Sequence, residues 1–132
     1  MMDLPGDYVL AALSISTALT AQEQTAITGL RGVTGATIEA AFTGGTGGDS
    51  LTALVRTRIG SGGTWREVAR FDFTVAASKS CTLVAGAAAI AAFAALSANT
   101  VLQGFLGTDF EAIVTSVGTY ADSALSIRLA AR

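Results

Sequence analysis

Apolar and polar residues alternate through the middle of the chain, in a pattern that predicts a β-hairpin. From Ser50 to Ile59 the odd-numbered positions are mostly apolar, while the even-numbered positions include two arginines. The alternation resumes at Trp65 and continues to Val75, after the glycine-rich turn at residues 60–63. Such a period of two is typical of antiparallel strands that each bury one face. We expect the inner face to hold Trp65 and two of the six phenylalanines.

The same period of two predicts strands along most of the remaining chain. The expected strands are Tyr8–Ser16, 25–28, Thr37–Thr43, Lys79–Val84, Asp109–Val117 and Ala124–Arg132. In the first of them, the residues predicted to face the core are Val9, Ala11, Leu13 and Ile15. The last two strands flank a turn at residues 118–122 and are expected to pair as a second hairpin.

The fold class follows from the number and spacing of these strands. Seven or eight strands, separated by glycine turns, predict an all-β fold in one domain over residues 1–132, an antiparallel β-sandwich that is jelly-roll-like or Ig-like. A parallel α/β sheet would need a helical crossover after each strand. The alanine-rich stretch 85–98 is open to three interpretations: a short helix, an apolar loop over the end of the sandwich, or a subunit contact.

The composition adds a hint about assembly. Of the 132 residues, 51% are hydrophobic and only 14% are charged, against about 25% charged in typical soluble domains. We interpret this as an assembly subunit; the alternatives are a membrane protein, or an alanine- and glycine-rich protein whose hydrophobic score is inflated by alanine. The apolar stretch 83–106 is long enough to span a bilayer, but its polar residues and its alanine content argue against insertion. No targeting peptide is expected over residues 1–7.

Residues with catalytic or metal-binding chemistry are few. The chain has no histidine and one cysteine, which excludes histidine-dependent catalysis, histidine metal ligands and an intrachain disulfide. Cys81 is expected to be a buried, apolar residue of a strand. The best carboxylate pair is Asp109 and Glu111, which share a strand face and are expected to be solvated. The loop Gly44–Asp49 lacks the Lys-Ser/Thr of a P-loop. We expect no enzyme activity, no cofactor and no metal.

The charges gather on one predicted surface. A net charge of −2 argues against a dedicated nucleic-acid-binding protein. Four of the eight positive residues are predicted to project from the outer face of the central hairpin, with Asp72 as the main acid among them. These residues are Arg56, Arg58, Arg66 and Arg70. The face is either a solvated surface or a docking surface for an acidic partner protein.

Three motifs carry a family resemblance. They are ITGLRG at residues 27–32, TWREVARFDF at residues 64–73, and the C-terminal segment from GTY at residues 118–120 to the final Arg132. From Tyr8 onward, the chain resembles small virion structural proteins of tailed bacteriophages and related gene-transfer particles. The resemblance implies a capsid decoration or cement protein on the virion head; the alternative is a tail or head-appendage subunit, such as a tube, terminator, fibre or spike base.

The resemblance also implies partners and a location. The expected partners are the major capsid protein or other virion proteins, and further copies of the chain, with a trimer suiting a three-fold capsid position. The protein would be made in the cytoplasm of a bacterial host and end in the virion, without binding nucleic acid or membrane. An alternative function of a different class is carbohydrate binding by the β-sandwich. The candidate aromatic residues for it are Tyr8, Trp65 and Tyr120.

Overall fold

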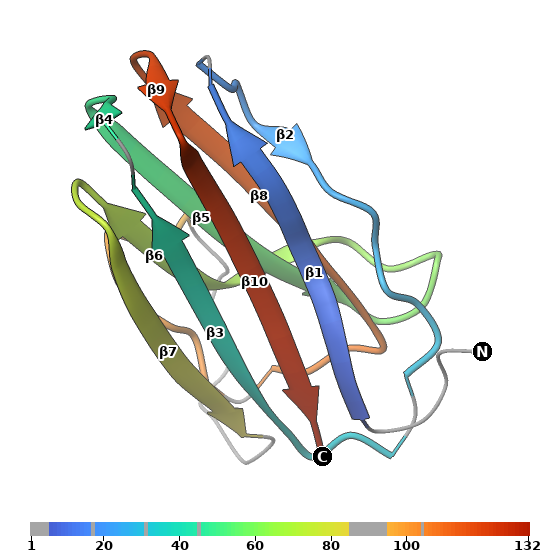
Figure 1. The fold of residues 1–132 in the computed structure, drawn as a ribbon. Helices are drawn as coiled ribbons and strands as arrows, with labels where there is room; N and C mark the ends of the chain where they lie inside the picture. The colour runs from blue at the N-terminus through green and yellow to red at the C-terminus, as the bar shows by residue number, and fades with distance from the viewer. Residues whose placement is uncertain (1–5, 17, 31, 45, 85–94, 104) are drawn as a thin grey trace.

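Two antiparallel sheets face each other and form a β-sandwich, as the sequence predicts (Figure 1). The computed structural model describes residues 6–16, 18–30, 32–44, 46–84, 95–103 and 105–132. The strands are β1 (Gly6–Ile15), β2 (Gln22–Glu23), β3 (Gly35–Thr43), β4 (Thr46–Gly47), β5 (Ser50–Arg58), β6 (Arg66–Phe73), β7 (Ala77–Val84), β8 (Asp109–Val117), β9 (Tyr120–Ala121) and β10 (Ser123–Ala131). One sheet has the order β1-β10-β3-β7 and the other β2-β8-β5-β6, while β4 and β9 form a separate pair.

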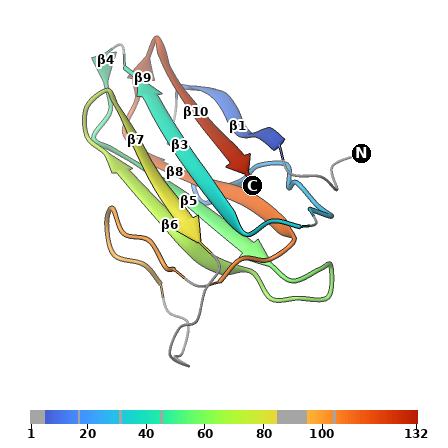
Figure 2. The ribbon, with the colours of Figure 1, turned by 90° about the horizontal axis from the view of Figure 1, so that it is seen from below.

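The core lies between the two sheets, which Figure 2 shows as stacked layers. The predicted inner faces of β3, β5 and β10 are confirmed, because their alternate residues are buried along the whole strand. The largest fully buried side chain is Phe110 of β8. Burial of apolar area is the main driving force for folding. Here alternate apolar residues of both sheets provide that buried area.

The first expected hairpin is confirmed and the second is wrong. Strands β5 and β6 pair directly, but β8 and β10 belong to different sheets. Their connection runs over the end of the sandwich, where Tyr120 packs edge-on against Phe42 with ring centroids 5.8 Å apart. Gly48 lies beneath this ring at φ +76°, and a Cβ there would come within 2.0 Å of it. Two glycines of the loop Gly44–Asp49 therefore lie next to Tyr120. Gly48 lies beneath its ring, and Gly47 lies opposite it in the β4–β9 pair.

A β-bulge in β1 changes the predicted inner face of that strand. The register shifts between Val9 and Ala11, so that Leu10 and Ala11 are both buried while Val9 is 52% exposed. A bulge adds one unpaired residue and reverses the alternation on one side of it. The prediction that Val9 faces the core is therefore wrong, whereas Ile15 is buried as expected.

A second bulge lies in β6 and changes the predicted arginine face. Val55 pairs with Ala69, but Arg56 pairs with Glu67, which leaves Val68 as the extra residue. Val68 and Ala69 both point into the core, and the residues before them are reversed. Strict alternation predicts Trp65 on the inner face and Arg66 on the outer face. The bulge reverses both positions, so both predictions are wrong.

Two other predicted segments differ in detail. The strand expected over 25–28 is an isolated bridge at Ile27, which pairs with Phe110, while the regular strand β2 lies just before it. Residues 85–94 of the stretch 85–98 lie outside the described residues, and residues 95–98 form no helix.

Candidate interaction surfaces

Three of the four predicted arginines share the outer face of the sheet β2-β8-β5-β6. Arg56 and Arg58 come from β5 and Arg70 from β6. The bulge places Arg66 opposite Thr57, whose side chain is fully buried between the sheets. The predicted four-arginine face is corrected in this respect: Arg66 belongs to the other side of the sheet.

The arginines of β5 neutralise two buried carboxylates of β8. Arg58 donates from Nε to Asp109 over 2.8 Å, and Arg56 donates to Glu111. The side chains of Asp109 and Glu111 are only 4% and 6% exposed. The expectation that this pair is solvated is therefore wrong. A buried carboxylate without a partner would cost several kcal/mol, so the two arginines are structural counterions.

The environment of Asp109 favours its ionised form. Burial alone would raise the pKa of Asp109, but hydrogen bonds from Arg58, from the Gly29 N–H and from Thr108 outweigh it, together with the charge of Arg58. The pKa of Asp109 is therefore held below its usual value. A carboxylate stabilised in this way is a weak proton acceptor, and it is unsuited to general acid or base catalysis near neutral pH.

Trp65 lies on this outer face, beneath the two arginines of β5. The guanidinium carbons of Arg58 and Arg56 lie 4.4 Å and 5.4 Å from its ring centroid. Each such cation–π contact contributes about 0.5–1 kcal/mol at an exposed site. The indole thus packs against the guanidinium groups of both arginines and stays half-buried itself.

The face as a whole is not basic. Its three arginines are matched by five carboxylates: Glu23, Glu67, Asp72, Asp109 and Glu111. An acidic partner protein would meet ion pairs that are already formed, so this surface offers it little free positive charge.

Residues 95–103, here called the strap, close one side of the sandwich next to β6 and β7. Val101 forms a bridge with Ala69 of β6, and Leu102 donates its N–H to Val68. Gln103 bonds through its side-chain amide to Thr82 and Val84 of β7. The strap therefore satisfies polar groups at the outer edges of both sheets, edges that would otherwise be open to pairing with another chain.

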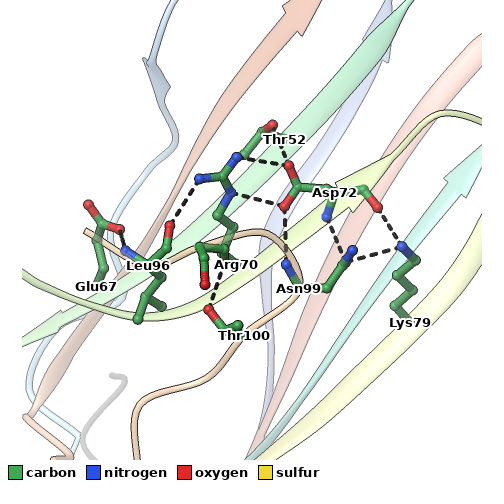
Figure 3. Close-up of polar contacts among 9 residues, drawn as sticks. Thr52, Glu67, Arg70, Asp72, Lys79, Leu96, Asn99 and Thr100 are labelled. Carbon is green, nitrogen blue, oxygen red and sulfur yellow. Dashed lines mark hydrogen bonds and ion pairs between the residues drawn. The ribbon is translucent and has the colours of Figure 1, made fainter. Parts of the chain in front are cut away.

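A polar network fastens the strap (Figure 3). Arg70 makes two hydrogen bonds to Asp72, of 2.9 and 3.0 Å, and a third to the carbonyl of Leu96. Asn99 accepts hydrogen bonds from the Asp72 N–H and from Lys79. Burial acts to raise the pKa of Asp72, but the bonds from Arg70 and its other donors outweigh it and lower the value.

A cavity of about 440 Å³ lies between β6, β7 and the strap, and Cys81 lines it. The thiol is half-buried, and burial raises its pKa to about 11. Because the thiolate is the nucleophile, Cys81 stays protonated and unreactive near neutral pH. Its expected role as a small apolar residue of the strand remains the simplest account of its position.

The outer face of the other sheet, β1-β10-β3-β7, has a different character. We call it the small-residue face. It consists of Asp7, Val9, Ala12 and Ser14 of β1, Ala124, Ser126, Arg128 and Ala130 of β10, Thr37, Glu39, Ala41 and Thr43 of β3, and Ser78, Ser80 and Thr82 of β7. Each of these side chains is exposed or half-exposed. All but four are alanine, serine or threonine.

The aromatic residues named for carbohydrate binding do not form a platform. Tyr120 is buried, and its hydroxyl donates to the Ser50 carbonyl over 2.8 Å. Trp65 is held beneath two arginines. Tyr8 is half-buried on β1 of the opposite sheet. A sugar-binding sheet face usually presents several exposed rings side by side, and these three residues lie apart.

Within the described residues, no group of three or more potential ligands could hold a metal ion, and no helix is long and apolar enough to cross a membrane. Comparison of the chain with protein-family models, with curated proteins and with solved structures finds no match in any of the three.

Proposed function

We propose that this protein is a non-enzymatic structural subunit of a virion, most simply a decoration protein that binds the assembled head. The single observation that supports this best is the small-residue face. It spans four long strands, and its charged side chains are Asp7, Glu39 and Arg128. A surface so poor in charge and large side chains suits close contact with another protein, because interface centres are depleted of charged residues.

The opposite side of the molecule supports the same role. There the arginines and carboxylates neutralise one another, so that side remains soluble while the small-residue face is covered. A subunit of an assembly needs this asymmetry, because one face is covered by another protein and the other meets the solvent. The resemblance to virion proteins of tailed bacteriophages points to the particle that would supply the contact.

Sedimentation with empty heads tests the proposal. Heads assembled from the major capsid protein of the same genome are expected to carry the protein down in a fixed ratio. Ala41→Arg, at the centre of the small-residue face, is expected to weaken this binding about tenfold or more, by placing an unpaired charge in the contact. Ala98→Arg changes an exposed alanine of the strap and is the matched control.

Two results would contradict the proposal. If the folded protein stays in the supernatant with heads but sediments with tail tubes, the appendage alternative takes its place. If it ignores both particles, the virion role fails altogether.

A further inference from the structure

Glu39 and Arg128 bring opposite charges together on the small-residue face. They lie on the neighbouring strands β3 and β10 and are directly opposite each other in the register. Both residues are exposed, and within the described part of the chain neither side chain has a hydrogen bond or an ion pair. These two charges are therefore available to a partner, unlike the paired arginines on the other side of the molecule.

The position of this pair gives the face a self-complementary charge pattern. Consider a two-fold axis that runs parallel to the strands, between β3 and β10. Rotation about it places β10 of one copy over β3 of the other, at the same level along the strands. Arg128 of each copy then faces Glu39 of its partner, and two equivalent ion pairs form. A two-fold contact requires such reciprocity, since the same patch serves on both subunits.

The shape of the face suits the same contact. A shallow hollow of about 310 Å³ lies on it, lined by Leu13, Leu125 and small residues of three strands that include Ala12, Ala41 and Ala124. With so little side-chain volume in the way, a second sheet can approach closely and pack face to face. Serine and threonine hydroxyls can both donate and accept, so they can bond to their counterparts on a second copy.

The area of the face is sufficient for a specific dimer. Four strands at about 4.8 Å spacing and nine residues at about 3.4 Å rise cover roughly 600 Å² on each copy. The total buried by two copies is then roughly 1,200 Å², at the lower end of specific interfaces.

From the charge pattern, the shape and the area, we infer that the small-residue face binds a second copy of this chain in a two-fold dimer, held by reciprocal Arg128–Glu39 ion pairs. The inference deepens the proposed function by naming what covers the face. It replaces the trimer expected from the resemblance with a dimer. The dimer is then the unit that binds the head, so the weaker head binding expected for Ala41→Arg follows from loss of the dimer.

Charge exchange at Glu39 and Arg128 tests the inference in solution, without heads. Light scattering of the wild-type protein is expected to give twice the chain mass of 13.3 kDa. Arg128→Glu or Glu39→Arg alone places like charges across the axis and is expected to weaken the dimer about tenfold or more. The double variant, with both changes, restores opposite charges and is expected to dimerise again. Ala41→Arg should also dissociate the dimer, and Ala98→Arg should not.

A single reversal also puts like charges on neighbouring strands of one chain, which destabilises by up to about 1 kcal/mol. The urea unfolding midpoint of each variant therefore accompanies its mass, and the double variant removes this intrachain repulsion. A single variant that loses the dimer but keeps a urea midpoint close to that of the wild type distinguishes a homotypic contact from a mere loss of stability.

Two results would overturn the inference. The first is a wild-type protein that is monomeric at about 100 μM. If that monomer still sediments with heads and Ala41→Arg does not, the small-residue face binds a head protein, and the proposed function stands. A dimer or larger oligomer that ignores all changes on the face would place the contact elsewhere. Conversely, a dimer that responds as expected but ignores heads and tails would keep the inference and remove the proposed function.

Discussion

At the scale of single residues, the main surprise is the burial of Asp109 and Glu111. Alternation in the sequence placed them correctly on one strand face, but it gave no sign that this face is covered. Their burial is accompanied by ion pairs with Arg56 and Arg58 from the neighbouring strand. Such partners come from distant parts of the chain, so strand periodicity alone does not reveal them.

The pairing of Asp109 leads to a pH-dependent prediction. Asp109→Asn is expected to lower the free energy of unfolding by about 1–3 kcal/mol at pH 7, because it weakens a charge-assisted hydrogen bond to Arg58. The folded-state pKa of Asp109 lies below its ordinary value. Its stabilising effect is therefore complete above the unfolded-state pKa of about 4 and is lost as the pH falls through the folded-state pKa.

Urea unfolding of the wild type and Asp109→Asn at several pH values between 7 and 2.5 measures this effect. The difference between the two proteins should narrow below about pH 4. Asp122→Asn, in an exposed turn, is the control and should stay within about 0.5 kcal/mol of the wild type throughout. A difference that stays constant down to pH 2.5 would show that the ionised carboxylate is not the stabilising group.

At the scale of elements, the sequence predicted the regular strands well and the bulges not at all. Strands β3 and β10 alternate without interruption, so their buried faces were read directly. A bulge adds one residue that obeys no period. In β6 the one sign in the sequence is Glu67: strict alternation puts this acid on the same face as Trp65, Ala69 and Phe71. The register explains it: Glu67 lies opposite Arg56, on the outer face.

The β6 bulge makes Trp65 a surface residue, and its replacement should cost less than that of a core aromatic. Trp65→Ala is expected to lower the free energy of unfolding by about 1–2 kcal/mol, since it removes partly exposed area and two cation–π contacts. Phe110→Ala, at a fully buried position, is expected to cost about 3–5 kcal/mol. Thermal or urea unfolding compares them. Equal losses would return Trp65 to the core and contradict the bulge.

The connection between β8 and β10 was also beyond sequence reasoning. A turn between two amphipathic strands indicates a hairpin, but the same turn can carry the chain from one sheet to the other. Here the choice depends on Tyr120, whose ring is buried at the end of the sandwich against Phe42. Among the described long strands that follow one another in the chain, only β5 and β6 pair within one sheet.

At the scale of the whole molecule, the two sheets present opposite kinds of outer surface. One carries arginines that are paired with carboxylates, and the other is made mostly of small side chains and is poor in charge. Composition indicated this only as a shortage of charge, without a location. The strap adds a further asymmetry, because it satisfies sheet edges on the side of β6 and β7. Non-specific strand pairing is thereby blocked on that side, and the small-residue face is left as the surface for association.

The strap should behave as a local unit whose stability depends on Asn99. Asn99→Ala removes the acceptor for the Asp72 N–H and for Lys79, so hydrogen exchange of the strap-bonded amides is expected to accelerate about tenfold or more. These amides are Arg70, Asp72 and Leu102. The Ile127 amide, in the middle of β10, should keep its protection.

Because Asn99 has φ +54°, Asn99→Gly separates backbone strain from the lost side chain. Faster exchange in both variants would show that the side-chain amide of Asn99 holds the strap in place. Faster exchange in Asn99→Ala alone would show that the backbone conformation at residue 99 does so. Uniformly faster exchange across both sheets would mean that the strap has no local stability of its own.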